Sequence, residues 1–229
     1  MTRLYDELSA ALAAHGLLLR GGFHATAADG VPAFDATRPA RTVLMIGHAG
    51  AGMWQAFSAA RAAGPNPLDR WSQGVIDDLA QRFGARPVYP YDTPSLPFLR
   101  WAERAWPLFA SPLGLLIDTE YGLWHALRGA LLLPDAIDLP EQPARASPCA
   151  TCVEKPCLTA CPVSAFGAAG YDVPACRGHL RTAAGEACLD GGCGARGACP
   201  VGVGWRYPDA QIRFHMESFS GIKRPRSSP

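Results

Sequence analysis

The chain has 229 residues, of which 48% are hydrophobic and 18% are charged, and its formal net charge is +1. This length suits one domain or two modest ones, with enough apolar residues for a hydrophobic core. No basic patch stands out, which argues against a nucleic-acid partner, and no apolar run is long enough to span a bilayer, so no membrane association is expected.

Helix and strand patterns alternate over the first two thirds of the chain. Apolar spacing predicts helices at residues 3–14, 53–61, 67–83 and 98–109. Short apolar runs rich in bulky or β-branched residues predict strands at residues 17–23, 41–46, 88–91 and 130–133. The last strand is expected to begin only after Gly129, because that glycine interrupts the preceding apolar segment. This mixture predicts an α+β or α/β fold rather than a helical bundle.

A change of composition predicts where the first domain ends. Prolines at positions 134, 140, 143 and 148 punctuate a linker, and the sequence then turns from aliphatic to rich in cysteine and glycine. We therefore expect a first domain at 1–145 and a second at 146–205. Residues 206–229 are expected to hold a final helix, at about 207–219, followed by a disordered tail.

All eight cysteines lie in the last third of the chain. Four occur in C-A-T-C-V-E-K-P-C-L-T-A-C-P, one is solitary, and three follow in a second group that also closes with Cys-Pro. They are Cys149, Cys152, Cys157, Cys161, Cys176, Cys188, Cys193 and Cys199. Bacterial two-cluster ferredoxins use C-x2-C-x2-C-x3-C-P, in which the fourth cysteine binds the other cluster. Eight thiolates are the number that two [4Fe–4S] clusters require, so we expect both clusters here.

The crossing of the fourth cysteine predicts which thiols share a cluster. Three thiolates on one short loop cap one cluster, while the cysteine before the proline faces the other. The first cluster is expected on Cys149, Cys152, Cys157 and Cys199. The second is expected on Cys161, Cys176, Cys188 and Cys193.

Two other readings of the cysteines stay open. An even number of cysteines also fits a disulfide framework, but no signal peptide is recognisable and a reducing cytoplasm disfavours disulfides. Paired C-x2-C spacing also suits structural zinc, although only one such tight pair is present. We expect a cytoplasmic iron–sulfur protein.

Four stretches of the first domain resemble the cobalamin-processing chaperones of the cblC type, which have a flavin-nitroreductase-like fold. They are G-L-L-L-R-G-G-F, V-L-M-I-G-H-A-G-A-G-M-W-Q-A-F, N-P-L-D-R-W and, most specifically, G-L-W-H-A-L-R-G-A-L-L-L-P-D-A-I-D-L-P. The whole chain, with its four-plus-one-plus-three cysteine layout, also resembles the group of epoxyqueuosine reductases and reductive dehalogenases. The resemblance implies a nitroreductase-like α/β sandwich followed by a small ferredoxin-like dicluster domain. It also implies a cobalamin held base-off.

Candidate cofactor-binding residues follow from the last of these blocks. Arg128 matches the arginine that lies near the cobalamin pocket in the chaperones, and Trp124, His125 and Gly129 adjoin it in sequence. Asp118, Glu120 and Tyr121 precede the block and are candidates for a proton donor, because reduction at cobalt requires protons. The competing reading places these three residues in a solvated loop.

The expected function is electron transfer from two clusters to cobalamin, for processing of the corrinoid itself or reduction of a small substrate. The expected partners are a corrinoid and an electron donor such as a ferredoxin, a flavodoxin or a reductase. Homodimer formation is also kept open, because the family fold often pairs two protomers. Two alternatives remain, a non-catalytic electron carrier of the ferredoxin type and a flavin mononucleotide (FMN) reductase on the same scaffold.

Overall fold

Four antiparallel strands form the central sheet in the computed structural model, which describes residues 3–222. Their spatial order is β1 (Leu18–His24), β2 (Thr42–Ala49), β6 (His125–Leu133) and β3 (Arg86–Val88). Every residue of β2 is buried, which explains why Val43–Ile46 form a continuous apolar run without polar alternation.

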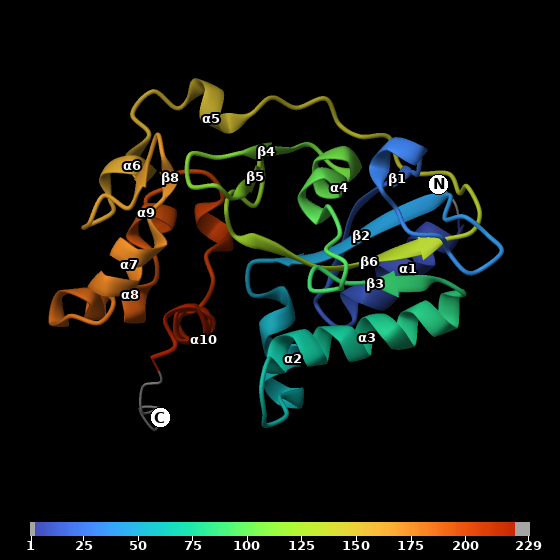
Figure 1. Ribbon diagram of the computed structural model, residues 1–229, viewed down its shortest axis with the longest axis horizontal. Coiled ribbons are helices and arrows are strands. Elements are labelled where there is room, and N and C mark those ends of the chain that lie inside the picture. The colour runs from blue at the N-terminus through green and yellow to red at the C-terminus, as the bar shows by residue number, and fades with distance from the viewer. Residues whose placement is uncertain (1–2, 223–229) are drawn as a thin grey trace. The chain divides into compact units, whose positions relative to one another are not determined.

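Four helices surround this sheet: α1 (Arg3–Ala13), α2 (Gly52–Ala60), α3 (Pro67–Phe83) and α4 (Phe98–Ala105). Figure 1 shows α3 and α4 on opposite faces of the sheet. α3 begins with Pro67 and ends at Gly84, which is left-handed with φ 63°, as expected for a helix with proline at its start and glycine at its end. α4 buries Phe98 and Trp101.

Several predicted elements differ in extent from the observed ones. The strand expected at 88–91 is β3, which covers Arg86–Val88, and the strand expected at 41–46 is β2, which extends to Ala49. The helix expected over 98–109 ends at Ala105, because Trp106 is extended (φ −152°, ψ 151°). Strand β6 begins at His125 and runs through Gly129, which pairs with Ile46 of β2. A Cβ atom on Gly129 would lie 3.0 Å from Ile76 Cδ1 of α3, so close packing against that helix favours glycine here, and this glycine does not end the strand.

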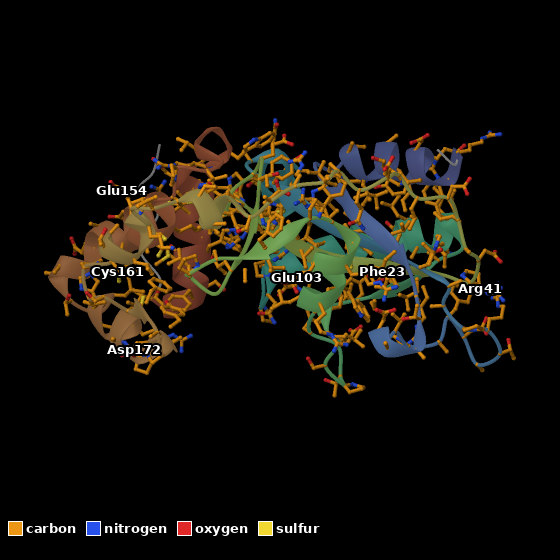
Figure 2. All side chains as sticks on the ribbon, turned by 90° about the horizontal axis from the view of Figure 1, so that it is seen from above. Phe23, Arg41, Glu103, Glu154, Cys161 and Asp172 are labelled. Atoms are coloured by element: carbon orange, nitrogen blue, oxygen red, sulfur yellow. The ribbon has the colours of Figure 1, made fainter. Side chains whose placement is uncertain are left out.

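Short elements make up the cysteine-rich part of the chain. They are β4 (Leu108–Ala110), β5 (Leu116–Asp118), α5 (Pro148–Thr151), α6 (Pro156–Thr159), β7 (Phe166–Gly167), β8 (Gly170–Tyr171), α7 (Val173–His179), α8 (Glu186–Gly191), α9 (Gly194–Gly197) and α10 (Asp209–Ser220). The sulfur atoms gather around Cys161 (Figure 2). The helix expected at about 207–219 is α10, whereas the expected tail at 223–229 lies outside the described residues.

The chain divides into two compact units. The first comprises Met1–Leu108 and His125–Arg145, and the second comprises Phe109–Trp124 and Ala146–Pro229. Residues 109–124, which the sequence analysis assigned to the first domain, therefore group with the cysteine-rich unit. The mixed α/β architecture is confirmed, and its sheet is antiparallel; the nitroreductase-like and ferredoxin-like assignments remain predictions. Within residues 3–222, no helix has the length and apolar character needed to cross a bilayer.

Candidate metal centres

Four cysteines surround a small cavity in the second unit. Cys149, Cys152, Cys157 and Cys199 line a space of about 20 Å³. Prolines 148, 156 and 200 lie beside them in its wall. We call these four thiols the first set.

Two short helical turns position the first set. Pro148 opens α5 and Pro156 opens α6, so a cysteine follows the proline in each turn. Proline suits the first helical position because its φ is already near the helical value. Lys155 precedes α6 in the left-handed region, with φ 40°. Four residues separate Cys152 from Cys157, two more than in the ferredoxin spacing, and the last two of them, Lys155 and Pro156, form the entry to the turn that carries Cys157.

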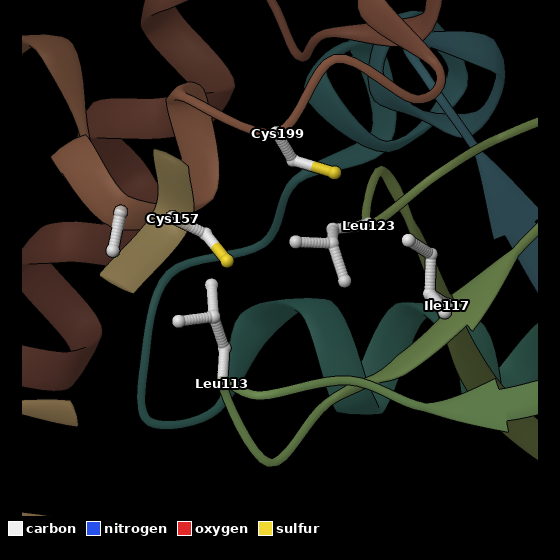
Figure 3. Packing of buried hydrophobic residues seen from close by; sticks show 6 residues of the cluster. Leu113, Ile117, Leu123, Cys157 and Cys199 are labelled. Carbon is white, nitrogen blue, oxygen red and sulfur yellow. The ribbon is translucent and has the colours of Figure 1, made fainter. Parts of the chain in front are cut away.

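Apolar residues from 109–124 pack against the first set. Leu113, Ile117 and Leu123 form one buried cluster with Cys157, Cys199 and Ala195. Figure 3 shows Cys157 and Cys199, from separate segments of the chain, with their side chains directed toward these apolar residues. This packing excludes water from one side of the thiols and explains why 109–124 belongs to the second unit.

The other four cysteines surround a larger cavity. Cys161, Cys176, Cys188 and Cys193, the second set, line a space of about 430 Å³. Phe166, Tyr171, His179, Arg196, Met216 and Phe219 also line it. The solitary Cys176 lies in α7, whose first turn is capped by Asp172, since the Asp172 carboxylate accepts the Ala175 N–H at 2.9 Å.

The electrostatics follow the same division into two sets. Burial raises the pKa of Cys149, and the neighbouring Cys199, Cys157 and Cys152 raise it further. Burial likewise raises the pKa of Cys188, to which Cys193, Cys176 and Cys161 add. Thiols of one set therefore oppose one another's ionisation, a cost that a bound cation would relieve.

Backbone N–H groups point at several of the sulfurs. Ala165 N donates to Cys161 Sγ at 3.3 Å, and backbone N–H groups of Arg196 and Ala195 lower the pKa of Cys193 against the dominant effect of burial. All eight cysteines are free thiols. Among the described residues, no three His, Cys, Asp or Glu side chains converge on the position of a single metal ion. Each set instead surrounds a cavity with four sulfurs and nearby N–H donors, and this donor chemistry fits a [4Fe–4S] cluster.

Asp118 holds a tight turn in the second unit. It is 1% exposed, and its Oδ1 accepts the backbone N–H groups of Glu120 at 2.7 Å and Tyr121 at 3.1 Å. Asp118 and Gly122 also form an isolated backbone bridge. Glu120 is exposed, and the Tyr121 ring packs edge-on against Trp205 at 4.7 Å. The three candidate proton donors thus share one turn, in which Asp118 has a clear structural role.

The four candidate cofactor-binding residues are divided between the two units. Trp124 closes a segment of the second unit, whereas His125, Arg128 and Gly129 belong to the first. The Trp124 Nε1 atom is buried and has no hydrogen-bond partner within the described part of the chain. Gly129 faces Ile76, Val88 and Tyr89, so it packs inside the first unit.

Arg128 lies in an acidic and aromatic surrounding that the sequence did not reveal. Its Nη1 donates to Asp69 Oδ1 at 3.3 Å. Tyr91 stacks on Tyr89 with ring centroids 5.3 Å apart. Burial raises the pKa of Tyr91 to about 12, with further contributions from Asp69, Asp92 and Asp77, while Arg128 acts in the opposite direction. Arg128 is therefore already engaged in a salt bridge.

Arg196 is a second residue that the cysteine spacing did not single out. Its Nε and Nη2 donate to the Leu123 carbonyl oxygen at 3.1 and 2.5 Å. The guanidinium lies 4.5 Å from the Trp124 ring centroid and 4.7 Å from that of Tyr207. Arg196 thus joins the wall of the second cavity to residues 123–124 within the same unit.

Comparisons with known proteins identify a related fold. No protein-family model matches the chain, and a search of curated proteins finds no significant match. The structure of an epoxyqueuosine reductase with an epoxyqueuosine-modified tRNA-Tyr stem loop aligns with TM-score 0.53 and 17% identity, covering 90% of this chain and 67% of that one. Selenomethionine-labelled epoxyqueuosine reductase aligns with TM-score 0.51 and 16% identity, covering 92% and 68%. At these identities the comparison establishes a shared fold.

One expectation from the sequence is overturned by this comparison. We expected no nucleic-acid partner, because the chain has no basic patch and a net charge of +1. A chain of the same fold is nevertheless solved with a tRNA stem loop. Net charge is an average over the chain, whereas contacts to phosphates and bases depend on a few side chains brought together locally. Composition therefore does not exclude nucleic acid for this fold.

Proposed function

We propose that this protein is an iron–sulfur oxidoreductase that carries two [4Fe–4S] clusters. One would be held by Cys149, Cys152, Cys157 and Cys199, and the other by Cys161, Cys176, Cys188 and Cys193. The observation that carries this proposal is the presence of two separate cavities, each lined by four of the eight thiols.

The protein supplies distinct environments for the two centres. Leu113, Ile117 and Leu123 keep water from one side of the first set, while backbone N–H groups near Cys161 and Cys193 stabilise thiolates of the second. When bound, such clusters accept and donate single electrons at potentials set by burial and hydrogen bonds to sulfur.

Anaerobic reconstitution with iron and sulfide tests the cluster proposal. If two [4Fe–4S] clusters form, the chain is expected to bind about eight iron and about eight sulfide ions. After dithionite treatment it is also expected to show the electron paramagnetic resonance (EPR) signals of reduced clusters. A colourless protein that retains zinc, or disulfides in the protein purified without oxygen, would contradict the proposal.

We further propose that the substrate is a modified nucleoside carried on tRNA. The support is the fold shared with epoxyqueuosine reductase in complex with a modified tRNA stem loop. The test is anaerobic incubation of the cluster-loaded protein with epoxyqueuosine-containing tRNA and dithionite, followed by nuclease digestion and mass spectrometry. Loss of epoxyqueuosine beyond a protein-free control supports this substrate. An unchanged nucleoside together with no measurable binding of the tRNA contradicts it.

Cobalamin is a finer proposal that rests on the resemblance of the 122–140 block. The described residues fit a corrinoid only in part, since Arg128 is paired with Asp69 and Gly129 packs against Ile76. The buried and unpartnered Trp124 Nε1 is the observation that favours a bound group. We therefore derive no reaction step through cobalamin.

Titration with hydroxocobalamin under reducing conditions tests the corrinoid directly. A base-off cob(II)alamin spectrum at one equivalent of protein supports it. The spectrum of free cobalamin contradicts it. In that case, flavin absorbance in the purified protein would favour an FMN reductase, and its absence together with intact clusters would favour an electron carrier.

A further inference from the structure

A stack of aromatic rings forms part of the wall of the second cavity. Phe166 and Tyr171, on the paired strands β7 and β8, stack with ring centroids 4.6 Å apart and planes at 11°. The ring centroid of Phe219 in α10 lies 6.3 Å from that of Tyr171, with the ring planes at 21°. The Arg177 guanidinium lies 5.0 Å from the Phe219 ring centroid. The ring of Tyr171 thus packs against two aromatic neighbours.

Tyr171 lines the second cavity together with the four thiols of the second set. Burial raises the pKa of Tyr171 above its ordinary value, and a side-chain hydrogen bond with Cys176 and the charges of Cys176, Cys193 and Cys161 raise it further. Three of the four cysteines of the set therefore lie within electrostatic range of one phenol. Tyr171 also remains 38% exposed, so it stands between the thiols and solvent.

The two cavities differ in whether a tyrosine lines them. No tyrosine is among the residues that line the first cavity, whose described walls consist of cysteine, proline, lysine and aliphatic side chains. The second cavity is larger, at about 430 Å³ against about 20 Å³, and it alone of the two has a phenol in its wall. Tyr171 is therefore a feature by which the chain distinguishes the centres.

We propose that Tyr171 is a positioning residue whose hydroxyl donates a hydrogen bond to the Cys176 thiolate of the occupied second centre and so raises the reduction potential of that centre. The physical reason is electrostatic. Reduction adds negative charge to the cluster and its thiolates, and an O–H donor stabilises the more negative state more strongly than the oxidised one. This inference rests on the proposed function, because it requires a cluster on the second set.

The substitution Tyr171→Phe tests this role, because it removes the hydroxyl and retains the ring that packs against Phe166 and Phe219. The measurement is an EPR-monitored redox titration of the cluster-loaded protein. The potential of one cluster is expected to shift downward while the other stays unchanged. The matched control is Tyr207→Phe, which removes a hydroxyl in the same unit from a residue that lines neither cavity and is expected to move neither potential.

Equal potentials in Tyr171→Phe and the unaltered protein, or equal shifts of both clusters, would overturn the inference. If Tyr171→Phe loses a cluster, replacement of tyrosine by 3-fluorotyrosine tests the same bond in the intact sequence. The fluorinated phenol is the stronger donor, so one potential is expected to rise, and an unmoved potential overturns the inference. Failure of the unaltered protein to hold clusters would instead count against the proposed function.

Discussion

Gly122 lies directly against the backbone carbonyl of Val201, and a Cβ atom on Gly122 would come within 2.0 Å of that oxygen. Gly122 is left-handed, with φ 58°, and so is Gly202, with φ 72°. Val201 follows Cys199 and Pro200 in sequence. This contact therefore joins the turn held by Asp118 to the loop that carries a thiol of the first set.

The substitution Gly122→Ala is expected to destabilise the second unit and weaken cluster retention at the first set. The new methyl group would clash with backbone that has no rotamer with which to move away, and the left-handed φ adds strain. Together these cost about 3 kcal/mol or more. Thermal unfolding and iron content after desalting measure the effect.

Gly114→Ala is the matched control for Gly122→Ala. Gly114 has a similar φ of 72°, but among the described residues other than its two chain neighbours no atom lies within 4 Å of a Cβ built there. It is expected to lose only about 1 kcal/mol from the left-handed conformation. Equal losses in the two variants would show that backbone strain, rather than the contact with Val201, explains the effect.

Double cysteine substitutions test which thiols share a centre. Cys161→Ser combined with Cys193→Ser is expected to remove no more than about half of the bound iron, because both thiols would serve one of two [4Fe–4S] clusters. Cys199→Ser combined with Cys193→Ser is expected to remove nearly all of it. Iron analysis and EPR measure how many clusters each variant keeps. If the first variant lost nearly all of its iron and the second only about half, Cys161 would share a centre with its neighbours in sequence.

Arg196→Lys is expected to lower the stability of the second unit by about 1 to 2 kcal/mol. A lysine ammonium lacks the planar fork that donates twice to the Leu123 carbonyl and lies over the rings of Trp124 and Tyr207. The measurement is the urea midpoint followed by tryptophan fluorescence. The same exchange at the exposed Arg213 is the control, and a comparable loss there would argue against a special role for Arg196.

Substitutions of Asp118 separate a structural role from a proton-donating one. Asp118→Asn keeps a carbonyl oxygen that can accept the Glu120 and Tyr121 N–H groups, whereas Asp118→Ala leaves both without that partner. We expect Asp118→Asn to stay within about 1 kcal/mol of the unaltered protein and Asp118→Ala to lose about 2 kcal/mol. If Asp118→Asn folds normally but loses reductase activity, the carboxyl group itself would be implicated as a proton donor.

A buried carboxylate in the first unit predicts a pH dependence of stability. Burial opposes the ionisation of Asp29, but hydrogen bonds from Thr26 and the charge of Arg104 outweigh it and hold the pKa below the ordinary 3.8. Because the folded-state pKa is lowered, the stabilisation is complete above about pH 4 and is lost as the pH falls through the folded-state value.

Asp29→Asn is therefore expected to cost about 1 to 2 kcal/mol at pH 7, with a smaller difference from the unaltered protein at pH 3. Because Arg104 is half-exposed, solvent screens its charge, and the expected cost lies at the lower end of the range for charged hydrogen bonds. Urea unfolding at both pH values measures it, with the exposed Asp78→Asn as control. A difference that does not change with pH would assign the effect to packing alone.

Features that depend on a few neighbouring residues were predictable from the sequence. Pro67 and Gly84 mark the ends of α3, and the apolar run Val43–Ile46 identifies a buried strand. The spacing of the cysteines and the two Cys-Pro closures predict metal binding. The ferredoxin spacing also predicts that Cys161 belongs to the second set. The same four thiols line one cavity in the structure. Their ligation of a cluster stays a prediction.

Features that depend on contacts between distant residues were decided only by the tertiary structure. Gly129 interrupts an apolar pattern in the sequence, yet pairing with Ile46 and packing against Ile76 keep it inside a strand. Residues 109–124 belong with the cysteines because their apolar side chains are buried there. The packing of Tyr171, on the β7–β8 hairpin, against Phe219 of α10 joins two segments that no local pattern relates. Local propensity acts over a few residues, whereas these positions are determined by burial and stacking between segments far apart in the chain.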